Sequence, residues 1–217
     1  MAIKNVYGFT DDGKKVKIGE YLEVFPVGGT IFYIDETSDA AYKFYDANMV
    51  ELSSVAVGDS PAYYEVITED SNGKDKYYIY NPTNGVVDSK AWGYYNIKTG
   101  ATSQAIGDGK TNTETILAIE DTSQYASDSI FTWLKSQREN KLGGCDDWFI
   151  GSKNEMEQLR LFVVANAGTG DIVDFFTDKE VWNSSENDTS LAYAWVFSSS
   201  YYRNKSNKIH CCCVRAF

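Results

Sequence analysis

Residues 181–217 read VWNSSENDTSLAYAWVFSSSYYRNKSNKIHCCCVRAF, and this stretch decides how the rest of the chain is interpreted. Short apolar runs separated by polar residues predict three strands, entered at Val181-Trp182, at residues 192–197 and at residues 209–217, with a polar turn at residues 203–207. The aromatic, charged and cysteine residues follow no simple amphipathic alternation. We therefore expect these residues to form a surface that something other than folding has selected.

Two helices are expected before this stretch. The first is predicted to begin near Ser127-Asp128, which suit an N-cap, and to end at Gly143-Gly144. The second is predicted to begin at Ser152, because Ser152 and Glu155 have the spacing of a capping box. Helical apolar spacing supports both predictions, through Ile130, Trp133 and Leu134 in the first helix and Met156, Leu159 and Val163 in the second. The second helix is predicted to end at Gly168.

The amino-terminal half predicts strands and turns. Residues 30–34 form an apolar run rich in strand-forming residues, two aromatic segments follow, and Asn72-Gly73 marks a turn before a tyrosine-rich strand. Residues 93–110 read as a glycine-punctuated loop. Strands, two helices and then a run of antiparallel strands indicate an α+β fold. We expect residues 1–25 to be an extension or a first hairpin, and residues 26–217 to form one domain.

Composition narrows the class of partner. The chain has 217 residues and a formal net charge of −11, which disfavours a nucleic-acid partner. Its 16 tyrosines and 5 tryptophans are residue types that binding surfaces favour. No apolar run approaches the roughly 18 residues needed to span a membrane. The first residues lack the apolar core of a signal peptide, so we expect a cytoplasmic protein, one exported without a Sec signal, a virion component, or a trimmed chain.

The single histidine and the four cysteines argue against a catalytic or metal site. In a strand, successive side chains point to opposite faces, so Cys211 and Cys213 share one face and His210 and Cys212 the other. This arrangement splits a metal cage and separates a cysteine from its neighbouring imidazole. Cys145 stands alone, and a disulfide to it is left open. We expect free thiols, no catalytic residues, no metal and no cofactor.

Several segments together resemble a known family, the C-type-lectin-fold variable proteins of diversity-generating retroelements, of the formylglycine-generating-enzyme-like type. Related domains lie at the carboxyl termini of bacterial surface proteins and phage tail proteins. The resemblance covers residues 26–217 in order, with departures at Gly151, where proline is usual, at Asn183, where serine is usual, and at the single terminal Val-Arg step. It rests on VGGTIFYID (27–35), TSQAIGDGKTNTETI (102–116), DDWFIGSKNEMEQL (146–159), WNSSE (182–186), AWVF (194–197) and VRAF (214–217).

The resemblance implies a C-type lectin-like domain in which two helices pack on antiparallel sheets and residues 182–213 form a variable face. Such retroelements replace template adenines, so AAC codons become NNC codons, which never encode Lys, Trp, Glu, Gln or Met. Invariant scaffold residues would then be Trp182, Glu186, Trp195 and Lys208, together with Lys205. The ligand-binding positions implied are Asn187, Asp188, Leu191, Tyr193, Phe197, Ser199, Tyr201, Tyr202, Arg203, Asn204, Asn207, Ile209, His210, Cys211 and Cys213.

The function implied by the resemblance is display of a ligand-binding or receptor-binding surface on a virion tail or a bacterial cell surface. Its partner would be a protein or glycan on a cell surface, and family analogy suggests a homotrimer. Two alternatives remain open. The first is a fixed carbohydrate-binding lectin. The absence of the usual calcium-lectin tripeptides from this sequence argues against it, and calcium-dependent binding would favour it. An oxidase of the formylglycine-generating type needs a copper-binding cysteine pair, which the adjacent cysteines do not supply.

Overall fold

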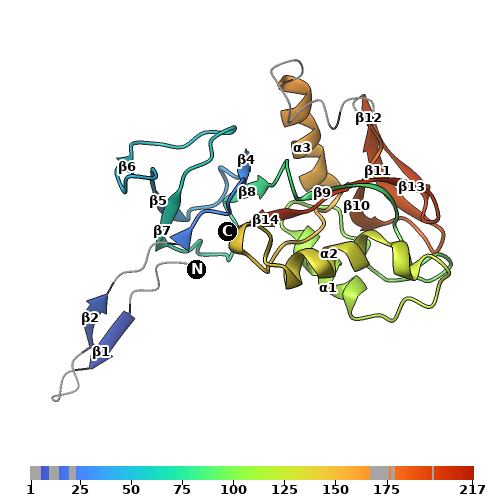
Figure 1. The fold of residues 1–217 in the computed structure, drawn as a ribbon, viewed down its shortest axis with the longest axis horizontal. Helices are drawn as coiled ribbons and strands as arrows, with labels where there is room; N and C mark the ends of the chain where they lie inside the picture. Colours follow the sequence, from blue (N-terminus) through green and yellow to red (C-terminus); the bar gives the residue numbers. More distant parts are fainter. Residues whose placement is uncertain (1–5, 10–14, 20–22, 167–175, 177–178, 197) are drawn as a thin grey trace.

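The computed structural model describes residues 6–9, 15–19, 23–166, 176, 179–196 and 198–217 (Figure 1). It is an α+β structure, as the sequence predicted. Figure 1 shows an elongated molecule, with the amino-terminal strands at one end and the α-helices of the described residues packed around a larger sheet at the other. No helix in the described ranges combines the length and the apolar character that crossing a bilayer requires.

The larger sheet has five strands in the order β12-β11-β10-β13-β9. Its members are β9 (Val86–Ala91), β10 (Val181–Glu186), β11 (Leu191–Val196), β12 (Ser199–Asn204) and β13 (Lys208–Cys212). Strand β10 pairs with β13 in parallel, so the prediction of antiparallel strands throughout is wrong at this pair. Strand β12 lies at one edge, whereas β13 lies between two other strands.

The predicted strand over residues 209–217 is two strands in different sheets. Strand β13 ends at Cys212, the backbone N–H of Cys213 donates to the carbonyl oxygen of Gly85, and β14 (Val214–Ala216) begins immediately afterwards. Strand β14 pairs with β8 (Tyr77–Tyr80), which also pairs with β4 (Thr30–Ile34). The two ends of the region 26–217 therefore meet on β8.

The remaining strands lie at the amino-terminal end. A four-stranded sheet has the order β3-β7-β5-β6, formed by β3 (Glu23–Val24), β5 (Ala41–Tyr45), β6 (Glu51–Leu52) and β7 (Tyr63–Thr68). Strands β1 (Val6–Phe9) and β2 (Lys15–Gly19) form a separate antiparallel hairpin, which projects from the body in Figure 1.

Helix α1 (Asp108–Leu117) was not predicted, because residues up to 110 read as loop. Its buried face has helical spacing, but three of its four members are small or polar: Gly109, Asn112 and Thr113, with Ile116. Apolar periodicity therefore gave no signal. Gly107 precedes the helix with a φ of 92°, a left-handed conformation that glycine adopts without a steric cost.

Helices α2 (Ile130–Glu139) and α3 (Lys153–Ala165) correspond to the two predicted helices. Ser129, not Ser127 or Asp128, caps α2, and the helix ends before the separate turn that holds Gly143 and Gly144. The capping box of α3 is confirmed, because Ser152 accepts from the Glu155 N–H and Glu155 accepts from the Ser152 N–H. Gly168, its predicted end, lies outside the described residues.

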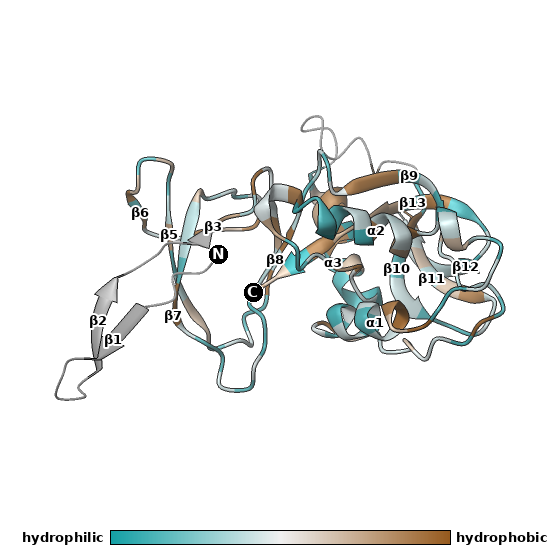
Figure 2. Cartoon of the chain, turned by 60° about the horizontal axis from the view of Figure 1, so that its bottom comes forward, coloured by the Kyte–Doolittle hydropathy of each residue, from teal (hydrophilic) through white to brown (hydrophobic). Residues whose placement is uncertain are grey.

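The five-stranded sheet separates two hydrophobic cores. One face packs on α1 and α2 through a core that includes Trp92, Phe131 and Trp182, and the other packs on α3 and the β14-β8-β4 sheet through a core that includes Phe32 and Trp195. Figure 2 shows hydrophobic segments gathered in the middle of the molecule and hydrophilic loops around its outside. Because both faces are covered, most residues of the interior strands β10 and β13 are buried.

Candidate functional site

The β11–β12 ribbon holds most of the predicted binding residues that are accessible. The two strands pair in register from Leu191↔Asn204 to Val196↔Ser199. Directly opposed residues in an antiparallel pair share a face, so Tyr193 lies beside Tyr202 on one face and Ala194 lies beside Tyr201 on the other. The ribbon thus divides the predicted binding residues between two surfaces.

The first surface, here called the tyrosine face, consists of Tyr193 and Tyr202 with Gln104 and Lys153. The two rings meet edge to face, with centroids 6.3 Å apart. The Lys153 ammonium lies 5.1 Å from the Tyr193 ring centroid and donates to Gln104, whose amide donates to the Tyr193 hydroxyl. Tyr202 is 54% exposed, so this held pair presents one large aromatic side chain to solvent.

Helix α3 fixes the same side of β12. The Ser200 hydroxyl donates to the Glu157 carboxylate over 2.7 Å. Arg160 donates two hydrogen bonds to that carboxylate, and these bonds, with the one from Ser200, hold the pKa of Glu157 below its ordinary value despite its partial burial. The backbone beneath the tyrosine face is therefore anchored to a helix as well as to β11.

The second surface lies on the opposite face of β12. Arg203 forms two hydrogen bonds to the Glu180 carboxylate, at 3.1 and 2.6 Å, and its guanidinium lies 4.2 Å from the Tyr201 ring centroid. The bonds from Arg203 hold the pKa of Glu180 below its ordinary value. This paired and stacked arrangement fixes Arg203, and its side chain remains 40% exposed.

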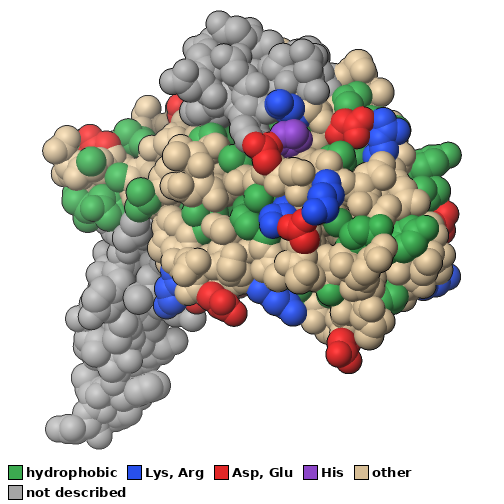
Figure 3. Space-filling model, turned by 45° about the vertical axis from the view of Figure 1, so that its right-hand side comes forward, with side chains coloured by type: hydrophobic (Ala, Val, Ile, Leu, Met, Phe, Trp, Pro, Cys, Tyr) green, Lys and Arg blue, Asp and Glu red, His purple; other side chains and the backbone are tan. Residues whose placement is uncertain are grey.

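A pocket of about 510 Å³ lies near Arg203. Glu180 lines this pocket and also accepts the hydrogen bonds from Arg203. His210 contacts the Asp88 carboxylate there, and burial lowers its pKa from the ordinary value. Figure 3 shows His210, the only histidine, among acidic and basic side chains on this surface. The pocket is lined by Asp88, Ser89, Lys179, Glu180, Lys208, Ile209 and His210.

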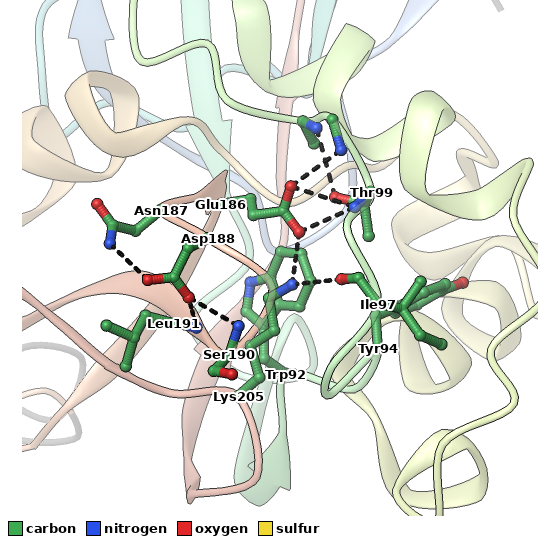
Figure 4. A network of polar contacts seen from close by, with 12 residues as sticks. Trp92, Tyr94, Ile97, Thr99, Glu186, Asn187, Asp188, Ser190, Leu191 and Lys205 are labelled. Carbon is green, nitrogen blue, oxygen red and sulfur yellow. Dashed lines mark hydrogen bonds and ion pairs between the residues drawn. The ribbon is translucent and has the colours of Figure 1, made fainter.

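Beneath the ribbon, Glu186 and Lys205 form a fully buried ion pair, shown in Figure 4. Their charged atoms are 2.5 Å apart, and Lys205 also donates to the Ile97 carbonyl oxygen and lies 4.5 Å from the Trp92 ring centroid. Burial lowers the pKa of Lys205, opposed by its bond to Glu186. The Glu186 carboxylate accepts hydrogen bonds from the backbone N–H groups of Thr99 and Gly100.

This network ties the loop around residue 99 to one end of the ribbon, the end where Leu191 pairs with Asn204. Glu186 ends β10, and Lys205 follows β12 directly. Between β10 and β11 the Asp188 carboxylate accepts from the N–H groups of Ser190 and Leu191, which lowers its pKa and shapes a tight turn. Asn187 and Asp188 are exposed at this turn.

Three predicted binding positions are corrected by their burial. Cys211 and Cys213 are fully buried and Ile209 is 8% exposed, so none of them can be a substantial contact for an external ligand in this conformation. The physical reason is that β13 is an interior strand with a core on each face. The predicted alternation does hold, since Cys211 and Cys213 face the Trp92 core and Cys212 faces the Trp195 core.

The predicted scaffold residues also include both buried and exposed side chains. Trp182, Glu186 and Trp195 are at most 1% exposed, but the Lys208 side chain is 51% exposed and bonds to Asp128 at the surface. Lys205, which directly follows β12, is instead the buried lysine. Phe197 lies outside the described residues. The remaining predicted positions are half-buried at Leu191 and Asn204 and exposed at Ser199 and Asn207.

The four thiols form no disulfide and are all buried. Burial raises the pKa values of Cys211, Cys212 and Cys213 well above the ordinary value, which keeps these thiols protonated. In the described part of the chain, no cluster of three or more His, Cys, Asp or Glu side chains could hold a metal ion.

Sequence reasoning did not find Gln104, Lys153 or Glu180 as neighbours of the ribbon. Gln104 and Lys153 lie within the segments that carry the family resemblance, but nothing in their spacing indicates contact with Tyr193. Comparison of this chain with protein family models, with curated proteins and with solved structures found no match.

Proposed function

We propose that this protein is a ligand-binding or receptor-binding display protein with a C-type lectin-like fold, whose binding surface is diversified by a retroelement. The observation that carries the proposal is the tyrosine face, where the largely exposed Tyr202 is held against Tyr193 on a ribbon with a buried base. Rigid aromatic side chains provide contact area at a low entropic cost and are frequent in binding surfaces.

The fold supports the lectin-like part of the proposal. The order of the motifs over residues 26–217 corresponds to strands, helices and a carboxyl-terminal sheet. Strands β4 and β14, from opposite ends of this region, both pair with β8. Two helices with the expected motifs, α2 and α3, lie on opposite sides of the five-stranded sheet through its two cores.

The distribution of residue types supports diversification. Of the five predicted scaffold residues, which NNC codons cannot encode, four are buried, namely Trp182, Glu186, Trp195 and Lys205, and Lys208 is exposed. The accessible positions on β12, including Tyr201, Tyr202 and Arg203, are all types that NNC codons can encode. Surface substitutions usually change stability by within about 0.5 kcal/mol, so such positions can vary while the fold persists.

The proposed partner is a protein or glycan on a cell surface, and the proposed location is a virion tail or a bacterial surface, with a homotrimer by family analogy. Binding of the labelled protein to a glycan array and to intact bacterial cells from its source community tests this. Tyr202→Ala should abolish the binding that the parent shows. Met49→Ala is the matched control, since Met49 is also 54% exposed but lies in the amino-terminal region.

Equal binding by Tyr202→Ala and the parent would contradict the assignment of the tyrosine face. Glycan binding that disappears on calcium chelation would favour the fixed carbohydrate-binding lectin instead.

A further inference from the structure

A second pocket, of about 340 Å³, shares no lining residue with the ribbon and lies where residues 215–217 meet residues of β5 and β7. One wall is aromatic. The rings of Tyr64 and Phe217 stack with centroids 4.3 Å apart, and Tyr42 meets Phe217 edge to face at 5.5 Å. All the residues that line this pocket belong to the described part of the chain.

The charged wall of the pocket has an excess of carboxylates. Four acids face two cations, which leaves a formal charge of −2 if all six groups are ionised. The acids are Glu69, Asp70, Asp75 and Asp147, and the cations are Lys74 and Arg215.

Most of these groups already have partners. Asp70 accepts hydrogen bonds from the backbone N–H groups of Asp39, Asn72 and Lys74, which hold its pKa far below the ordinary value. Arg215 donates to Asp147 over 2.6 Å, and its guanidinium lies 5.4 Å from the Phe217 ring centroid. The pocket thus already holds one guanidinium between a carboxylate and an aromatic ring.

Asp75 is different. It is half-buried, and its carboxylate accepts no hydrogen bond from any residue in the described ranges. Burial raises its pKa, opposed by the more distant charges of Lys110 and Arg215. A partly desolvated carboxylate without a donor is unfavourable in the free protein, and a ligand that brings a donor and a positive charge would relieve that cost.

We propose that this pocket binds an organic cation, the ammonium or guanidinium group of a lysine or arginine side chain of a partner, between Asp75 and the aromatic wall. The carboxylate supplies a charge-assisted hydrogen bond, and the Tyr42 ring supplies cation–π attraction, whereas the Phe217 ring already stacks on Tyr64 and lies beside Arg215. The excess of acids attracts a cation and disfavours an anionic ligand. This site is independent of the tyrosine face.

The test is titration of the ¹⁵N-labelled full chain with N-acetyl-arginine amide and N-acetyl-lysine amide, followed by NMR. N-acetyl-glutamine amide, of similar size but neutral, is the control ligand. The proposal predicts that the cationic amides shift the backbone signals of Tyr64, Asp75 and Ala216, and that the neutral amide does not. Equal shifts with the neutral amide, or none with either cation, would overturn it.

Asp75→Asn should weaken the affinity for the cationic amides about tenfold, which corresponds to the loss of one charge-assisted hydrogen bond. Asp146→Asn should leave binding unchanged, because Asp146 is an exposed acid one residue from the pocket residue Asp147. If Asp75→Asn changes the NMR spectrum globally, the variant Tyr42→Leu is tested in its place. Loss of the Tyr42 ring should weaken binding of the cationic amides severalfold. Binding by the folded variant that equals the parent's contradicts the proposal.

Discussion

Replacement of Lys205 by methionine tests the physical basis of the ribbon. Methionine retains most of the volume of the lysine stem but removes the ammonium that lies 2.5 Å from Glu186. The Glu186 carboxylate then keeps its two backbone N–H donors and loses its counter-charge. Because both side chains are 0% exposed, solvent cannot screen the loss.

The expected cost follows from that burial. Removal of one partner from a buried pair typically costs about 3–5 kcal/mol, although the intact pair itself contributes little net stability. For a chain of this size each kcal/mol shifts Tm by roughly 2–4 °C, so Lys205→Met should lower Tm by roughly 6–20 °C. Differential scanning calorimetry and urea unfolding followed by circular dichroism measure the change.

Lys208→Met is the matched control. Lys208 likewise pairs with a carboxylate, that of Asp128, at 2.5 Å, but its side chain is 51% exposed. The same substitution should therefore lower the free energy of unfolding by less than about 1 kcal/mol. The double variant Lys205→Met with Glu186→Leu should be less destabilised than the sum of its single variants. The reasoning is refuted if Lys205→Met costs no more than Lys208→Met.

Three further predictions concern the base of the site. Gly109→Ala should destabilise the fold by more than about 2 kcal/mol in urea unfolding, because the added Cβ would overlap the Glu155 carboxylate and lie 2.6 Å from the Ser152 backbone nitrogen; a neutral result contradicts this packing. Burial raises the pKa of Glu155 to about 7 from an ordinary 4.5. The contribution of this group to stability should therefore be greatest below about pH 4.5 and fall by about 3 kcal/mol as pH rises through 7. Unfolding of the parent and of Glu155→Gln across pH 5–8 should show this slope only in the parent. The thiols of residues 211–213 should react with Ellman's reagent only after unfolding, because burial keeps them protonated and inaccessible; rapid labelling of the native protein would show that β13 opens.

Local signals predicted the parts of the fold that local interactions determine. The capping box at Ser152 and Glu155 located the start of α3, since both hydrogen bonds are made within one helical turn. The apolar run at residues 30–34 gave β4 with the correct bounds. Helix α1 was missed because its buried face uses Gly109, Asn112 and Thr113, which carry no hydrophobic periodicity.

Long-range pairing was the part that sequence could not provide. The run of cysteines resembled a surface because its residue types are unusual, but β13 lies inside the sheet, and this position depends on the parallel pair that it forms with β10. Likewise, Lys205 and Lys208 are chemically the same and only three positions apart. Only the contact of Lys205 with Glu186 and Trp92 distinguishes the buried lysine from the exposed one.

The central claim, a diversified surface on a fixed scaffold, is tested most directly by deep sequencing the 3′ end of the gene across its source population. The account predicts variation concentrated in the codons for accessible positions such as Tyr193, Tyr202 and Arg203, with Trp195 and Lys205 unchanged. An unvarying 3′ end, or variation spread evenly over buried and accessible codons, would contradict it.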